Sequence, residues 1–193
     1  IISKEMMSFT IVSIILFSVA VALLVANLSG IPQSTSQATV LAITAVGIYF
    51  HDFDSRRLTT EIIPTWLILP VIAFIFSFLI GRYIYRPLRK KGYVSSEKVK
   101  NNPVINLITI LVSLFVAFSI GSNNVANASG PIASMTINEL NIVVNSKNFT
   151  LILILSTLVV APSFGIGSSI FGHKILEKTG KDIVQFGNVE AII

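Results

Sequence analysis

Amide and hydroxyl side chains are concentrated in one segment of an otherwise apolar chain, residues 121–135. This segment has the sequence Gly-Ser-Asn-Asn-Val-Ala-Asn-Ala-Ser-Gly-Pro-Ile-Ala-Ser-Met. The apolar run before it, residues 104–120, would carry a helix to about the middle of a bilayer or beyond, at roughly 1.5 Å per residue. Polar groups at that depth are costly unless they face protein, water or a ligand. Because the segment also contains helix-breaking glycines and a proline, we interpret it as a binding site on a discontinuous helix.

The asparagines of this segment have a spacing that places them together on a helix. Asn123 and Asn127 are four residues apart and share one face, and Asn124 precedes Asn127 by three. Their amides could bind a ligand. They could also only hold neighbouring helices together, as polar and small side chains often do in membranes.

A second group of hydroxyl residues stands at the start of a new apolar run. Ser34, Thr35 and Ser36 follow Gly30 and Pro32, which are expected to end the preceding helix. A hydroxyl side chain in this position caps the free N–H groups of the next helix. The same N–H groups, hydroxyls and positive dipole end could also cradle an anion. The cap and the anion cradle are therefore alternative interpretations of one pattern.

The elements that must position these groups are membrane helices. Charged residues make up 12% of the 193 residues, against about 25% in soluble domains, and apolar residues make up 53%. Mean hydropathy is +0.82. The apolar runs that could cross or enter a bilayer are residues 6–28, 38–50, 62–81, 104–120 and 149–172. We therefore predict an all-α, polytopic membrane helix bundle with discontinuous, broken or re-entrant, helices.

Basic side chains dominate the polar loop at residues 82–103. They are Arg82, Arg86, Arg89, Lys90, Lys91, Lys98 and Lys100, against Glu97. The positive-inside rule places this loop in the cytoplasm and the loop at residues 51–61 outside. Binding of anionic lipid is the alternative to this plain role in topology. Because the net charge of +5 is local, it does not indicate nucleic-acid binding.

The chain offers no set of groups for enzyme chemistry. It has no cysteine and two histidines, which stand alone at loop edges, and no acidic residue lies inside an apolar run. Nucleophilic or metal-assisted catalysis needs a nucleophile with a base, or a cluster of ligands. We therefore predict no enzyme activity and no bound cofactor.

The asparagine segment resembles the signature of the inorganic phosphate transporter (PiT) family. Residues 121–133 are similar to the family pattern Gly-Ala-Asn-Asp-Val-Ala-Asn-Ala, which is often followed by Gly-Pro. Residues 30–37, Gly-Ile-Pro-Gln-Ser-Thr-Ser-Gln, resemble a second family pattern, Gly-(Leu/Ile)-Pro-Val-Ser-Thr-Thr-His. The two patterns, their order and the spans between them extend the resemblance over essentially the whole chain.

The resembled family is built from two repeats of opposite membrane orientation. Its members carry phosphate with sodium ions or protons, and some bacterial relatives carry sulfate. The resemblance implies that residues 1–81 are the end of a first repeat, 82–103 a cytoplasmic loop and 104–193 the start of a second repeat. It also implies an interior piece of a longer multi-pass protein of the plasma membrane. A second asparagine motif is then expected before residue 1, and a second Pro-x-Ser-Thr motif after residue 193.

By this resemblance we expect secondary active transport of phosphate by alternating access, coupled to sodium ions or protons. The expected substrate-binding residues are Ser34, Thr35, Ser36, Ser122, Asn123, Asn124 and Asn127. The three asparagines are also expected to bind the cation, with no metal beyond sodium. Expected partners are membrane lipid, the remaining repeats of the same protein and, as a candidate, a second copy in a homodimer. Transport of sulfate is the alternative, and an anion channel is a remoter one.

Two residues depart from the family patterns. Asn124 replaces the acidic residue of the first pattern, and Gln37 replaces the histidine of the second. An asparagine carbonyl can coordinate sodium, but asparagine cannot take up a proton near neutral pH. The coupling ion and the choice between phosphate and sulfate therefore stay open.

Overall fold

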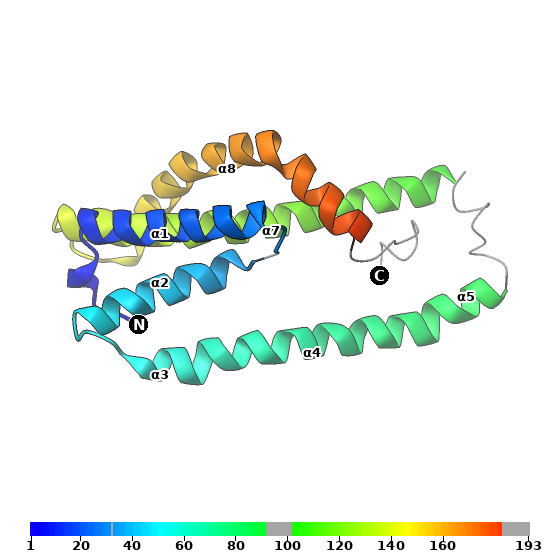
Figure 1. Ribbon diagram of the computed structural model, residues 1–193, viewed down its shortest axis with the longest axis horizontal. Helices are drawn as coiled ribbons and strands as arrows, with labels where there is room; N and C mark the ends of the chain where they lie inside the picture. The colour runs from blue at the N-terminus through cyan, green and yellow to red at the C-terminus, as the bar shows by residue number, and fades with distance from the viewer. Residues whose placement is uncertain (32, 92–101, 183–193) are drawn as a thin grey trace. The chain divides into compact units, whose positions relative to one another are not determined.

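The computed structural model describes residues 1–31, 33–91 and 102–182. Over these ranges the regular secondary structure is entirely helical, which confirms the all-α prediction (Figure 1). Four helices are long and apolar enough to cross a membrane: Phe9–Leu28, Ser55–Lys90, Pro103–Glu139 and Lys147–Ile170. Thr35–Tyr49 is apolar but shorter. The chain thus has the helices of a multi-pass membrane protein.

The helices follow one another along the chain with short connections. In order they are η1 (Lys4–Met6), α1 (Phe9–Leu28), α2 (Thr35–Tyr49), α3 (Ser55–Arg57), η2 (Leu58–Ile62), α4 (Ile63–Ile80), η3 (Gly81–Tyr85), α5 (Arg86–Lys90), α7 (Pro103–Glu139) and α8 (Ser146–Asp182). Here η2 and η3 are short π-helices. The chain forms two compact units. Unit 1 contains Ile1–Ser55 and Ile120–Lys178, and unit 2 contains the described part of Arg56–Ser119 with a short stretch from Thr179.

In unit 1, α1 and α2 form a helical hairpin joined by a short non-helical connection (Figure 1). The chain leaves α1 through Gly30, whose φ of 72° is accessible to glycine without steric cost. The N–H of Ile31 donates back to the Ala26 carbonyl at 2.9 Å and closes the last turn. The predicted helix end before Ser34 is therefore confirmed.

The second predicted break is wrong. Residues 121–135 lie inside α7, which runs without interruption from Pro103 to Glu139. Polar side chains in the helix find partners on α2, so the backbone does not have to unwind to satisfy them. Pro131 cannot donate a backbone hydrogen bond, and the one it removes is the bond that the Asn127 carbonyl would accept. One missing bond within a long helix is tolerated when packing holds the rest, and Pro131 is buried.

Small side chains carry much of the helix packing in unit 1. α1 buries Val12, Ile15 and Val19, and α7 and α8 pack through Ala133, Ile137 and Ile152. The other buried positions include small or hydroxyl residues: Ala38, Thr39, Thr44, Gly47, Ser129 and Ser156. Small residues of this kind let helices approach closely where lipid removes the usual hydrophobic driving force.

At one end of unit 1, hydrogen bonds join the start of α1 to the end of α7. The Phe9 N–H donates to Oε1 of Glu139 at 2.7 Å. The amide of Asn138 donates to the Glu5 carbonyl at 3.2 Å. These are contacts between residues far apart in sequence, and they place the first turn of α1 beside the last turn of α7.

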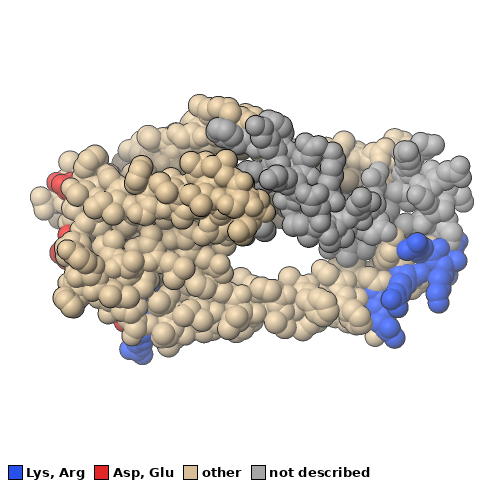
Figure 2. Space-filling view, in the orientation of Figure 1, with Lys and Arg blue, Asp and Glu red and all other residues tan. Residues whose placement is uncertain are grey.

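The end of α2 lies at the same end of unit 1. The N–H of Ser3 donates to Oδ2 of Asp52 at 2.9 Å, and the N–H of Asp54 donates to the Ile1 carbonyl at 2.9 Å. Hydrogen bonds from the Ser3 hydroxyl, and then from its N–H, lower the pKa of the Asp52 carboxyl from 3.8. We call this region, with Glu5, Asp52, Asp54 and Glu139, the acidic end; acidic side chains are visible at the left of Figure 2.

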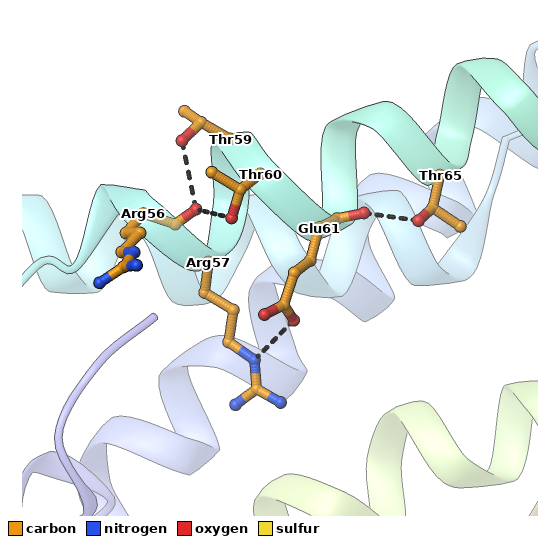
Figure 3. A network of polar contacts seen from close by, with 6 residues as sticks. All are labelled: Arg56, Arg57, Thr59, Thr60, Glu61 and Thr65. Carbon is orange, nitrogen blue, oxygen red and sulfur yellow. Dashed lines mark hydrogen bonds and ion pairs between the residues drawn. The ribbon is translucent and has the colours of Figure 1, made fainter.

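In unit 2, a polar helix start leads into a long apolar helix. The predicted loop at residues 51–61 is shorter than expected, because the helix already begins at Ser55. Figure 3 shows why the start is stable: the hydroxyls of Thr59 and Thr60 donate to the Arg56 carbonyl, at 3.2 and 2.7 Å. The hydroxyl of Thr65 donates to the Glu61 carbonyl. Such bonds satisfy carbonyls around the π-helical turn η2.

The other end of this helix is basic. The helix extends through η3 and α5 to Lys90, well into the predicted loop at residues 82–103. Figure 2 shows Lys and Arg gathered over α5, where the chain has Arg82, Arg86, Arg89, Lys90 and Lys91. The remainder of that predicted loop, residues 92–101, lies outside the described residues.

Candidate functional site

The first half of the candidate site is the N-terminus of α2. Ser34 is the N-cap, and its Oγ accepts from the Gln37 N–H at 3.3 Å. The Ser34 carbonyl accepts from the Ala38 N–H at 3.1 Å. The N–H groups of Thr35 and Ser36 have no acceptor within the helix, because they belong to its first turn. The cap predicted from the sequence is thus present, and two N–H donors stay at the positive end of the helix dipole.

The second half is the asparagine face of α7, which lies against this helix start within unit 1. The amide of Asn127 donates to Oγ of Ser36 at 2.9 Å and to Oγ1 of Thr35 at 3.3 Å. The amide of Asn123 donates to the same Ser36 Oγ at 3.1 Å. The Thr35 hydroxyl donates to Oδ1 of Asn124. Two segments about ninety residues apart therefore meet through five polar side chains.

The hydrogen count in this network separates the two hydroxyls. Thr35 accepts from Asn127 and uses its hydrogen on Asn124, so its hydroxyl is engaged in both directions. Ser36 accepts from both Asn123 and Asn127, so its own hydrogen points to neither amide. Ser36 is accordingly the hydroxyl of the network that can donate to a ligand.

No charged side chain takes part in this described network. The local field is set by the α2 N-terminus, whose partial positive charge favours an anion. A cation would have to be held by carbonyl oxygens, because no cluster of His, Asp or Glu side chains suited to a metal ion occurs in the part of the chain that the structure describes. The site is thus neutral overall, with donors from one helix and amide groups from the other.

The structure brings together five of the seven residues selected from the sequence. Thr35, Ser36 and the three asparagines form the network. Ser34 is occupied by the helix cap, and Ser122 lies next to Asn123 on α7, where it is exposed. Whether any of the seven binds substrate is a separate question, and for that role they stay candidates.

Sequence reasoning missed a second layer beneath the network. The hydroxyl of Thr39 donates to the Thr35 carbonyl at 3.0 Å, and Thr39 is buried. Ser129, two residues beyond Asn127, is 1% exposed. The missing i→i−4 bond at Pro131 also leaves the Asn127 carbonyl available at the network. The spacing of Thr35 and Thr39, one helical turn apart, was the signal that could have indicated the first of these.

Comparisons with known proteins agree on one family. The model of the phosphate transporter family matches residues 1–193. The chain is 30% identical over 193 residues to the sulfate permease CysP of Bacillus subtilis (strain 168), covering 100% of this chain and 49% of that protein. It is 24% identical over 165 residues to a probable low-affinity inorganic phosphate transporter of the same organism, covering 84% and 47%.

A putative phosphate permease of Helicobacter pylori (strain ATCC 700392 / 26695) is 25% identical over 123 residues, covering 63% of this chain and 22% of that protein. The chain spans about half the length of the first two relatives. No solved structure matches it.

Proposed function

Because the chain belongs to the phosphate transporter family, we propose that it is part of a secondary transporter that moves inorganic phosphate across the membrane with a cation. The observation that carries the proposal is the network between the α2 N-terminus and the α7 asparagines. Helix ends and polar side chains gathered inside an apolar bundle are a common arrangement for substrate sites in secondary transporters. Phosphate is also the substrate in the printed names of several relatives.

In the proposed binding mode, anion oxygens accept from the Ser36 hydroxyl and from the first-turn N–H groups of α2. The Thr35 hydroxyl and Asn124 orient this helix start, because they bond to each other across the two helices. The amides of Asn123 and Asn127 hold the Ser36 oxygen, which fixes the direction in which its hydrogen points. The anion thus replaces part of its hydration shell with donors that are already in place.

The cation is proposed to bind to asparagine carbonyl oxygens close to the anion. Asn123, Asn124 and Asn127 each have one side-chain carbonyl, and the Asn127 backbone carbonyl is freed by Pro131. Opposite charges in a low-dielectric site attract strongly, so the two ligands should bind cooperatively. Sodium suits such oxygen ligands better than a proton does, because no carboxylate of the network is available to be protonated.

Sulfate is the second candidate substrate. The relative matched over this whole chain is named a sulfate permease. Sulfate at neutral pH has no proton to donate, so it needs donors alone, and Asn124 already spends its side-chain oxygen on Thr35. A site with donors and few free acceptors suits sulfate as well as phosphate.

The test is uptake by the full-length protein in sealed vesicles. Labelled phosphate and labelled sulfate are compared with a sodium gradient, a proton gradient or neither. We expect uphill uptake of phosphate that follows the sodium gradient, and competition by excess unlabelled phosphate. Uptake of sulfate alone would reassign the substrate, and passive, gradient-independent flux would favour an anion channel instead.

The variant Asn127→Ala links this uptake to the site. It removes the amide that donates to both hydroxyls, so we expect uptake to fall by tenfold or more while the protein still inserts into the membrane. Asn148→Ala is the matched control, because that asparagine belongs to the start of α8 and its amide donates to the Val143 carbonyl. Equal uptake in the two variants would show that the α7 asparagines only hold helices together.

The membrane setting follows from the same proposal. The protein is expected in the plasma membrane, with the basic end of the Ser55–Lys90 helix in the cytoplasm. It is expected to act as a transporter and not as an enzyme. Its partners would be the other repeat elements, the surrounding lipid and, as a candidate, a second copy in a homodimer.

A further inference from the structure

Two sets of contacts join the α1–α2 hairpin to α7, and only one of them is the candidate site. The other lies at the acidic end, where Phe9 donates to Glu139 at 2.7 Å and Asn138 donates to the Glu5 carbonyl at 3.2 Å. Along α7, Glu139 lies about 18 Å beyond Asn127, at roughly 1.5 Å per residue. The proposed function gives a role to the first set of contacts and none to the second.

The stretch of α7 between these two levels is tightly packed. Ala133 is fully buried and Ile137 is 9% exposed. On α1, Val12 and Ile15, which follow Phe9 by one and two turns, are each 1% exposed. A hydrated anion could not pass through such a layer. In this structure the route from the site to the acidic end is therefore closed.

The bond between Phe9 and Glu139 replaces a missing helix cap. Phe9 is the first residue of α1, so its N–H has no acceptor within the helix. Ser8, the N-cap residue, makes no side-chain cap bond. The Glu139 carboxylate supplies the acceptor, and its negative charge is favourable at the positive end of the α1 dipole. The cap of α1 is thus complete only while α1 and α7 stay together at this end.

The same bond is suited to being broken. It lies in an exposed position, so water can take over both partners when they separate. A buried charge left without a partner would make opening very costly, whereas an exposed one makes it cheap. The packed layer of apolar side chains next to it holds no buried charge among the residues described here.

We propose that Glu139, assisted by Asn138, is a latch that keeps the acidic end of the transport route closed and releases it when the protein opens to that side. Glu139 is a positioning residue, because it acts through the start of α1 and does not touch the substrate. The proposal rests on alternating access in the proposed function. It adds the group that closes one of the two sides.

The test measures closure without using transport. Ile137→Cys is introduced as the single cysteine of the full-length protein; the present chain has none of its own. A membrane-impermeant thiol reagent is applied from the side of the acidic end. Glu139→Ala should raise the rate of modification about tenfold, and Glu139→Gln should raise it less, because the glutamine carbonyl can still accept from Phe9. Glu5→Ala is the control, since only the Glu5 backbone carbonyl takes part.

Uptake kinetics supply a readout that simple damage to the fold would not produce. If the latch opens, more of the protein is ready to bind substrate from that side, so the apparent KM should fall while the maximal rate falls as well. Equal thiol modification in parent, Glu139→Ala and Glu139→Gln would overturn the latch. Should Glu139→Ala fail to fold, Glu139→Gln and Asn138→Ala decide by the same criterion. Absence of phosphate and sulfate uptake in every protein would refute the proposed function, and the thiol rates would still decide the latch.

Discussion

At the scale of single residues, the site depends on which group spends its hydrogen bonds on which partner. Thr35 is engaged as donor and acceptor, whereas Ser36 only accepts within the network. These two neighbouring hydroxyls are alike in sequence but differ in what they can offer an anion. The pattern of hydroxyls and amides was visible in the sequence. The division of roles was not, because it depends on the register between two helices about ninety residues apart.

The first prediction concerns Ser36. Ser36→Ala removes the acceptor of two amides and the hydroxyl that can face the anion. An unsatisfied donor costs about 1–3 kcal/mol, so we expect the affinity for the transported anion to weaken at least tenfold. Ser36→Thr keeps the hydroxyl and should weaken it much less. The measurement is concentration-dependent uptake in vesicles.

The control for Ser36 is Ser168→Ala. Ser168 is on α8 and its hydroxyl donates to the Gly165 carbonyl at 3.0 Å, outside the network. Its substitution should leave the uptake curve in place. A similar loss in both variants would mean that uptake reports general damage to the helices.

Gly47 gives a second prediction at this scale. A Cβ at position 47 would lie 2.5 Å from Cγ2 of Ile2 and 3.2 Å from the Asp52 carbonyl oxygen. Gly47→Ala should therefore destabilise the protein by about 1–3 kcal/mol through overpacking, despite the better helix propensity of alanine. Gly165→Ala is the matched control, because nothing lies within 4 Å of its added Cβ. Thermal unfolding in detergent compares the two, and equal transitions would contradict the close approach of the N-terminal segment to α2.

At the scale of elements, the ends of helices were easier to predict than their continuity. Gly30 and Ser34 have strong local signals for an end and a start, and both act as expected. Gly130 and Pro131 are equally strong local signals, yet α7 continues through them. The reason is tertiary: the asparagines on that helix bond to α2, and the buried face of α7 packs on α8. A breaker in the sequence predicts a weak point, and the neighbours decide whether the helix ends there.

The connection after α2 gives a prediction on pH. Hydrogen bonds from Ser3 lower the pKa of Asp52, so the folded protein binds a proton there less readily than the unfolded chain does. The stabilisation is present above the unfolded value of 3.8 and is lost as the pH falls through the lowered value. We expect the stability of the parent to approach that of Asp52→Asn as the medium is acidified through this range. Hydrogen exchange of the Ser3 amide measures the change locally, and a constant difference between the two proteins at all pH values would contradict it.

At the scale of the whole molecule, the charges define two different ends. The Ser55–Lys90 helix is long enough to cross a bilayer, at about 1.5 Å per residue against a core of about 30 Å. It begins next to Asp54 of the acidic end and finishes among Arg82, Arg86 and Arg89. If this helix crosses the membrane, its two ends must face opposite sides. The positive-inside rule then places the basic end in the cytoplasm and the acidic end outside.

Two single cysteines test this orientation in intact cells. Val143→Cys lies in the connection between α7 and α8 at the acidic end, where Val143 is 80% exposed, and Lys91→Cys follows the basic end. A membrane-impermeant reagent should label Val143→Cys directly and Lys91→Cys only after the membrane is permeabilised. Replacing Arg82, Arg86 and Arg89 with glutamine should make part of the protein insert the other way, because the charge bias that sets orientation is reduced. Labelling of both cysteines from the same side would mean that this helix does not cross the membrane, and the latch would then have to be assigned to another side of the transport route.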